Sequence, residues 1–262
     1  MIKIRGAVLV LLACALLVRT LEMSVDFLPE IPFGVTAVGV SDVLALAALV
    51  ALLKHERFTL DRKAKLAAYA LIATMVVVAA AFVVTTGIAP TISVFMVGVS
   101  EEIVYRLAAP LLIALLLQRV GMAWRYALPI AILLGALWFM ALPGHVAQFQ
   151  TWFSPLVFVF FALLMSRVVW RGGALWPAIA AHIGIDIVTM MTNIGAAPQV
   201  FRLVATAILL LSLAPIIDAL AKTRPAMREG VVVIDEDETV IDLREAQPLG
   251  GEASGVDRRV AV

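Results

Sequence analysis

The sequence predicts an all-α protein, a polytopic membrane helix bundle with about eight transmembrane helices. Of its 262 residues, 63% are hydrophobic and only 15% are charged, and the mean hydropathy is +1.05. Soluble domains are about half apolar and about a quarter charged, so a water-soluble fold is excluded and membrane lipid is the expected solvent. The net charge of +1 gives no indication of a nucleic-acid partner, and we expect none.

The chain contains eight apolar segments of the length that crosses a bilayer, which takes about 20 residues as a helix. They cover residues 6–21, 34–53, 66–88, 91–117, 126–148, 152–169, 174–192 and 200–221. Residues 1–221 therefore form a transmembrane domain. Residues 222–262 form a polar tail that we expect to be mobile, with a hairpin of Val231–Asp235 and Thr239–Leu243 as the alternative.

The basic residues alternate between successive connections, which supports the count of eight spans. The segments rich in Lys and Arg are the start of the chain and every second connection after it. They carry Lys3 and Arg5; Lys54 to Lys65; Arg119 and Arg125; Arg167 and Arg171; and Lys222 to Arg228. The connections between them carry at most Arg19 or Arg202. Cytoplasmic loops are enriched in Lys and Arg, so we expect an integral protein of the cell membrane with both termini in the cytoplasm.

The fourth segment carries the first group of ionisable residues within the membrane, where such residues are rare and usually functional. Glu102 and Arg106 are spaced i, i+4 and can pair on one helix face. Glu101 lies about 100° away around the helix and has no local partner, so it is a candidate general base. The alternative is that all three charges only hold helices together. Asp42 stands alone in the second segment. Asp218 lies one turn before Lys222, at the cytoplasmic end of the last segment, and is expected to reach water.

Two later segments each contribute a histidine. In the seventh, His182 and Asp186 share a face, and Gly184 permits the close approach of another helix. In the fifth, the dipeptide Pro143-Gly144 predicts a break in the helix just before His145. Broken helices are tolerated at membrane depth where they line a cavity.

With these residues the sequence resembles the CAAX-protease and bacteriocin-processing (CPBP) family of intramembrane proteases over residues 91–192. The family's Glu-Glu-x-x-x-Arg motif is matched by Glu101, Glu102 and Arg106. Its final His-x-x-x-Asn/Asp motif is matched by His182 and Asp186, with the Trp-Pro-Ala sequence of Trp176–Ala178 before it.

The sequence departs from the family pattern at two points. The Phe-x-x-x-His motif has Ala141 four residues before His145, and the preceding phenylalanine is Phe139, six residues before it. The last motif ends in Asp186, where many relatives carry Asn. An ionised Asp186 would be a poor donor to an oxyanion, so either a protonated or a purely orienting carboxyl is expected there.

The resemblance implies hydrolysis of a peptide bond in a membrane-associated protein or peptide by an activated water. Glu101 would be the general base, His145 would help to position the water, and His182 would donate to the oxyanion with help from Asp186. Glu102 and Arg106 would support the site, and no cofactor is predicted.

Two alternatives remain open from the sequence. A catalytic zinc can be held by two histidines and a carboxylate, here Glu101, His145 and His182, although no His-Glu-x-x-His signature is present. Buried Glu, His and Asp also form proton relays in transporters, and a scaffold of this family can bind a partner without acting as an enzyme.

The depth of the candidate residues gives a structural prediction. At 1.5 Å per residue, Glu101 lies about 15 Å and His182 about 12 Å into a core about 30 Å thick. An unbroken fifth helix would carry His145 about 28 Å, to the far surface. We therefore predict that the break at Pro143-Gly144, or a late helix start after Pro129, turns His145 back towards Glu101.

Overall fold

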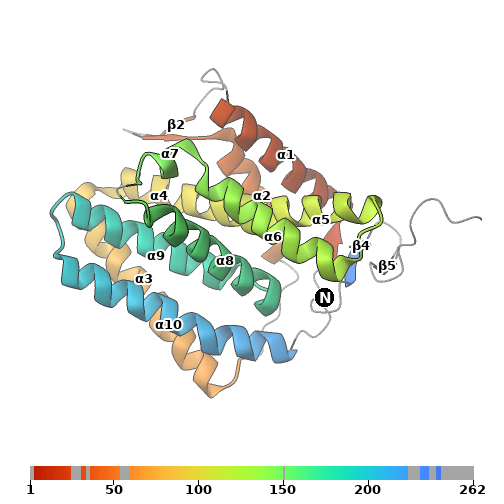
Figure 1. The fold of residues 1–262 in the computed structure, drawn as a ribbon. Coiled ribbons are helices and arrows are strands. Elements are labelled where there is room, and N and C mark those ends of the chain that lie inside the picture. Colours follow the sequence, from red (N-terminus) through yellow and green to blue (C-terminus); the bar gives the residue numbers. More distant parts are fainter. Residues whose placement is uncertain are drawn as a thin grey trace, which may run out of the picture.

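The structure, a computed structural model, describes residues 3–24, 31–33, 36–53, 60–149, 151–223, 231–235 and 240–242. Within this part of the chain it is a bundle of long helices packed side by side (Figure 1). Eight long helical segments are present there when the consecutive helices of the fourth are counted together. The predicted membrane helix bundle is confirmed.

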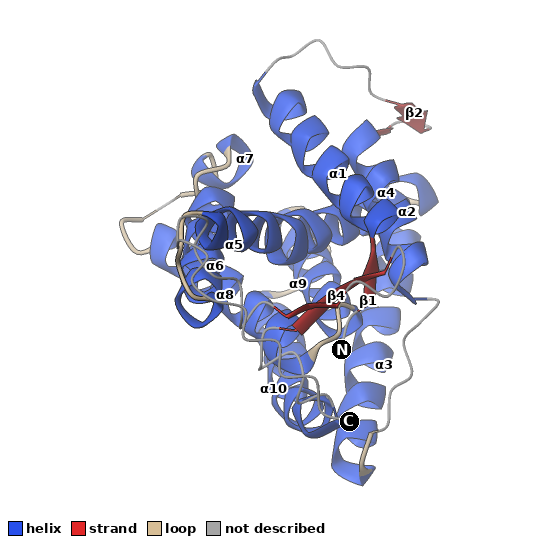
Figure 2. Cartoon of the chain, turned by 90° about the vertical axis from the view of Figure 1, so that its right-hand side faces the viewer, coloured by secondary structure: helices blue, strands red, loops and turns tan. Residues whose placement is uncertain are grey.

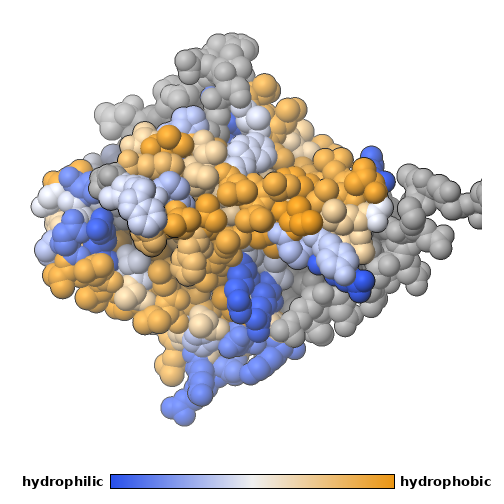
Figure 3. Space-filling view, viewed as in Figure 1, coloured by the Kyte–Doolittle hydropathy of each residue, from blue (hydrophilic) through white to orange (hydrophobic). Residues whose placement is uncertain are grey.

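The helices follow the apolar segments closely. Their bounds are α1 Gly6–Ser24, α2 Val40–Leu53, α3 Arg62–Thr86, α4 Ile88–Glu101, η1 Glu102–Ala108, α5 Ala109–Arg119, α6 Trp124–Met140, α7 Pro143–Val146, α8 Ser154–Gly172, α9 Trp176–Asn193 and α10 Gln199–Thr223. Among the described residues, α3, α8 and α10 are long and apolar enough to cross a membrane, and α2 and α6 are shorter apolar helices. Large apolar side chains cover much of the outer surface (Figure 3), as expected for a protein in contact with lipid.

Short strands lie outside the bundle and were not all expected. Strand β4 (Val231–Asp235) pairs antiparallel with β5 (Val240–Asp242), which is the predicted hairpin alternative for this part of the tail. Strand β4 also pairs in parallel with β1 (Lys3–Arg5), directly before α1 (Figure 2). Strand β1 and a strand of the tail therefore meet at one end of the bundle. Strands β2 (Ile31–Phe33) and β3 (Thr36–Val38) form a separate antiparallel pair, and the rest of the tail lies outside the described residues.

Close helix contacts at two glycines hold the functional helices together. A Cβ on Gly98 of α4 would come within 2.6 Å of Ile183 Cγ1 on α9, and a Cβ on Gly184 of α9 would come within 2.8 Å of Leu209 Cδ1 on α10. Small residues at such contacts allow helix backbones to approach closely. The approach predicted at Gly184 is confirmed, and α4 is held against α9 three residues before Glu101.

Candidate active site

The Glu-Glu-x-x-x-Arg segment does not form the continuous α-helix that was predicted over 91–117. Residues Glu102–Ala108 form the π-helix η1 between α4 and α5, and the N–H of Ala109 donates to Val104 O, five residues back. Pro110 has no N–H, so it cannot bond to the carbonyl of Arg106 as an α-helix requires. Trp170 Nε1 of α8 donates to that carbonyl instead, at 2.7 Å. Pi-helical turns are rare and frequently occur at functional sites.

Glu102 joins Arg106 to His182. Its Oε1 accepts a hydrogen bond from His182 Nδ1 at 2.7 Å and lies 3.5 Å from Arg106 Nε. Glu102 and Arg106 are both fully buried, and the Arg106 guanidinium carbon lies 3.9 Å from the centre of the Phe139 ring. The predicted pair is present, but Glu102 also fixes the ring of the candidate catalytic histidine, which sequence spacing alone did not indicate.

Glu101 faces the other nitrogen of the same histidine. Its Oε2 lies 3.6 Å from His182 Nε2, and the residue is 8% exposed. Asp186 Oδ2 lies 3.4 Å from the same nitrogen, and its side chain is 38% exposed. Because Glu102 occupies Nδ1, the Nε2 edge of His182 is directed towards Glu101 and Asp186. Two helices thus bring two carboxylates to one imidazole nitrogen.

The predicted helix break places His145 beside this group. Helix α6 starts at Trp124, so Pro129 lies inside it and no late start occurs. The helix ends at Met140, and the one-turn helix α7 begins at Pro143. His145 Nδ1 donates to the carbonyl of Phe139 at 2.6 Å, because a carbonyl oxygen can only accept. The turn between α6 and α7 therefore brings His145 against Phe139, six residues earlier, with ring centres 4.1 Å apart.

All four candidate catalytic residues line one cavity of about 630 Å³. Glu101 comes from α4, His145 from α7, and His182 and Asp186 from α9. The remaining walls are largely apolar and come from α4, α8, α9 and α10: Val94, Val97, Val157, Phe158, Phe160, Phe161, Leu164, Ile185, Met190 and Leu210. Mostly apolar cavities of 300–1,000 Å³ with a few convergent polar groups are typical of ligand sites.

Helix α1 contributes a residue that the sequence analysis missed. Arg19 was interpreted as part of a connection, but it lies within α1 and its Nη2 is 3.6 Å from Glu101 Oε1. Its Nη1 lies 3.8 Å from Asp42 Oδ1 and 3.9 Å from Glu22 Oε2, and Arg19 also hydrogen-bonds Tyr105. The buried Asp42, which stood alone in the sequence, is therefore a partner of Arg19. The sequence signal for this contact was the presence of opposite charges, Arg19 and Asp42, in the first two apolar segments.

For the peptide hydrolysis that the family motifs imply, we expect replacement of Arg19 by glutamine to lower kcat about 10- to 100-fold with little change in KM. The lost contact would free Glu101 to rotate away from His182, and misplacement by about 1 Å can cost about 100-fold in rate. Steady-state kinetics with a membrane-anchored peptide measures the effect, with Arg19→Lys as the variant that keeps the charge and Arg171→Gln, which removes a surface pair, as control. If Arg19→Gln were less stable but each folded molecule kept the native rate, the role of Arg19 would be purely structural.

The described residues contain no group of three His, Cys, Asp or Glu side chains already placed to hold a metal ion. Nδ1 of His145 is bonded to Phe139 O, and Nδ1 of His182 is bonded to Glu102. A bond from Nδ1 to a carbonyl or carboxylate oxygen is also usual for metal-ligating histidines. Glu101, His145 and His182 line one cavity, and zinc binding by this set stays a prediction.

Comparison with known families agrees with the motifs. The family model described as type II CAAX prenyl endopeptidase Rce1-like matches residues 84–188. Neither the search of curated proteins nor the search of solved structures finds a match. The matched segment includes Glu101, Arg106, His145, His182 and Asp186, whereas Arg19 and Asp42 lie outside it. The resemblance to the CPBP family of CAAX-type membrane proteases, predicted from three motifs, is thus confirmed over residues 84–188.

Proposed function

We propose that this protein is an intramembrane endopeptidase that hydrolyses a peptide bond of a membrane-associated protein or peptide with a water activated by Glu101. The observation that carries the proposal is the position of Glu101 Oε2, 3.6 Å from His182 Nε2 in a cavity that His145 and Asp186 also line. A hydrolase within lipid must admit water and an extended peptide, and the cavity of about 630 Å³ supports both requirements.

In the proposed reaction, Glu101 takes a proton from water as the water oxygen attacks the carbonyl carbon of the scissile bond. His145 donates through Nδ1 to Phe139, so its Nε2 is free to accept a hydrogen bond from that water. The C–N bond then breaks, and Glu101 returns the proton to the leaving amine. The glutamate thus acts first as base and then as acid.

His182 is the proposed donor to the oxyanion. When it carries a proton on both nitrogens, its charge is balanced by Glu102 at Nδ1 and by Asp186 near Nε2. The Nε2 proton can then be donated to the developing negative charge, and donors of this kind are typically worth about 2.7–4 kcal/mol in the transition state. In this proposal Asp186 orients His182, so an ionised Asp186 does not have to act as an oxyanion donor.

One experiment separates the proposal from its rivals. The purified protein in lipid nanodiscs is given a quenched fluorescent peptide held in the bilayer by a lipid anchor, with and without a zinc chelator. Hydrolysis that the chelator leaves unchanged is expected for the glutamate mechanism. Loss of hydrolysis with the chelator would favour zinc in place of Glu101 as the activator of water. Absence of hydrolysis under both conditions would favour a proton relay or a partner-binding scaffold.

A further inference from the structure

The cavity is confined to one half of the bundle. On α4 its lining residues run from Ser93 to Glu101, and on α9 they run from His182 to Asn193, the last residue of that helix. On α8 the first lining residue is Val157, three residues after the helix begins. Since α4 and α8 begin where α9 ends, on the left in Figure 1, the lining residues all extend from the candidate catalytic group towards that end.

The opposite end of the bundle is closed by packed side chains. Trp124 at the start of α6 and Trp170 near the end of α8 meet edge to face, with ring centres 6.4 Å apart. Trp170 is also hydrogen-bonded to Arg106 O, directly behind the buried pair of Glu102 and Arg106. Leu175 and Ile217, which are 4% and 5% exposed, belong to the buried hydrophobic core. Among the described residues, the cavity therefore gives a substrate access to Glu101 from the end where α9 finishes.

The basic residues gather at the closed end. Arg62, Lys63, Lys65, Arg119, Arg125, Arg167, Arg171 and Lys222 lie at the starts of α3 and α6 and at the ends of α5, α8 and α10. Strand β1 lies at this end too (Figure 2). At the cavity end, the connections at residues 87, 141–153 and 194–198 contain no Lys or Arg, and Arg202 follows within the first turn of α10. By the positive-inside rule the closed end is cytoplasmic.

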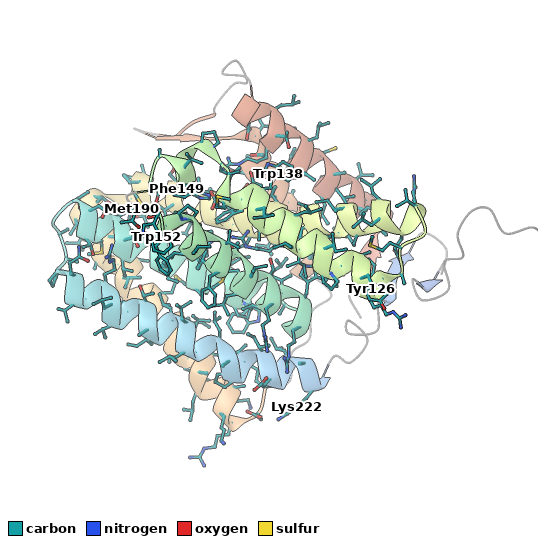
Figure 4. The ribbon with its side chains drawn as sticks, viewed as in Figure 1. Tyr126, Trp138, Phe149, Trp152, Met190 and Lys222 are labelled. Carbon is teal, nitrogen blue, oxygen red and sulfur yellow. The ribbon has the colours of Figure 1, made fainter. Side chains whose placement is uncertain are left out.

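Polar and aromatic side chains share the mouth of the cavity. Gln148, Thr189 and Asn193 line it and supply a path that water can wet. Trp152 is 84% exposed and Met190 is 40% exposed, and Figure 4 shows both at the same end of the bundle as Phe149. Exposed tryptophan is typical of the boundary between lipid and water. The mouth therefore lies at a membrane surface, where a lipid-anchored peptide can enter sideways.

We propose that the cavity opens at the non-cytoplasmic face of the membrane and accepts an extracytoplasmic segment of a membrane-anchored protein or peptide. The inference rests on the proposed endopeptidase function and names the class of its substrate. The scissile bond lies next to the membrane on the outer side, and the apolar walls from α8 and α10 accept the apolar part of the substrate. The released peptide leaves on the side opposite the basic loops.

Cysteine labelling tests the direction of access. The single natural cysteine, Cys14, is replaced by serine, and one cysteine is introduced at Asn193, at Thr189 or, as the matched control at the closed end, at the exposed Lys222. Intact cells are treated with a membrane-impermeant maleimide, before or after permeabilisation. We expect Asn193→Cys and Thr189→Cys to be labelled in intact cells and Lys222→Cys to be labelled only after permeabilisation. The reverse pattern would overturn the proposal, as would labelling of the cavity positions only in denatured protein.

A cleavage assay in sealed right-side-out vesicles tests the substrate class. The lipid-anchored quenched peptide is added from outside, and we expect the same rate of hydrolysis before and after permeabilisation. Hydrolysis that requires permeabilisation would overturn the proposal. Labelling of the cavity from outside without any hydrolysis would instead contradict the endopeptidase function, so the two failures are distinguishable.

Discussion

Replacing Glu101 by glutamine is expected to reduce kcat for hydrolysis of a membrane-anchored peptide by about 100- to 10,000-fold, the usual contribution of general acid–base catalysis. Glutamine has the same shape, and its amide oxygen can still face Arg19, whose Nη2 lies 3.6 Å from Glu101 Oε1 in the native protein. What it loses is the capacity to take a proton from water. The rate is measured by fluorescence of the cleaved peptide, and folding is measured by thermal unfolding of the purified protein.

Asp218→Asn is the matched control for this experiment. This substitution makes the same change from carboxylate to amide. The Asp218 side chain, however, is 65% exposed and pairs with Arg171 at the other end of the bundle. We expect this variant to retain the native rate. If Glu101→Gln also retained it while remaining folded, Glu101 would not be the base, and Asp186, the other carboxylate near His182 Nε2, would take its place.

The positions of the long helices along the sequence could be predicted, because each follows from a physical requirement that acts on its segment alone. Lipid leaves backbone polar groups without partners unless they bond within a helix, so hydropathy along the chain is sufficient to find each one. The largest deviation at a helix start is at α2, which begins at Val40 where the apolar run suggested residue 34. The β2–β3 pair precedes it, and no hydropathy pattern distinguishes that short pair from more helix.

The contacts between helices were less predictable, because they depend on which faces meet. The π-helix η1 had a signal in Pro110, since the missing N–H frees the carbonyl of Arg106, but the donor that satisfies this carbonyl is Trp170, 64 residues away. Likewise, Arg19 reaches Glu101 only because α1 packs against η1. The family motifs lie within residues 84–188 and carry no information about that contact.

Replacing Glu102 by glutamine is expected to destabilise the fold, in contrast to Glu101→Gln. Arg106 is fully buried and lies 3.5 Å from Glu102 Oε1. Removing one partner of a buried charge pair leaves the other uncompensated, which typically costs about 3–5 kcal/mol. The amide oxygen can still accept from His182 Nδ1, so the expected loss arises mainly from the stranded arginine. Thermal unfolding followed by tryptophan fluorescence should show a large fall in Tm, and the yield of folded protein should fall with it.

A second substitution separates the charge from the rest of the site. In the double variant Glu102→Gln, Arg106→Met, the buried charge is absent and an apolar side chain occupies the space against Phe139. Replacing a buried ion pair by apolar groups of similar volume is often neutral or stabilising, so we expect Tm and the yield to recover. Hydrolysis should recover only in part, because Glu101, His182 and Asp186 keep their positions on α4 and α9 but the negative charge beside His182 Nδ1 is absent. A Glu102→Gln variant with native Tm and no hydrolysis would show instead that Glu102 takes part in the chemistry, and the roles assigned to the two adjacent glutamates would have to be exchanged.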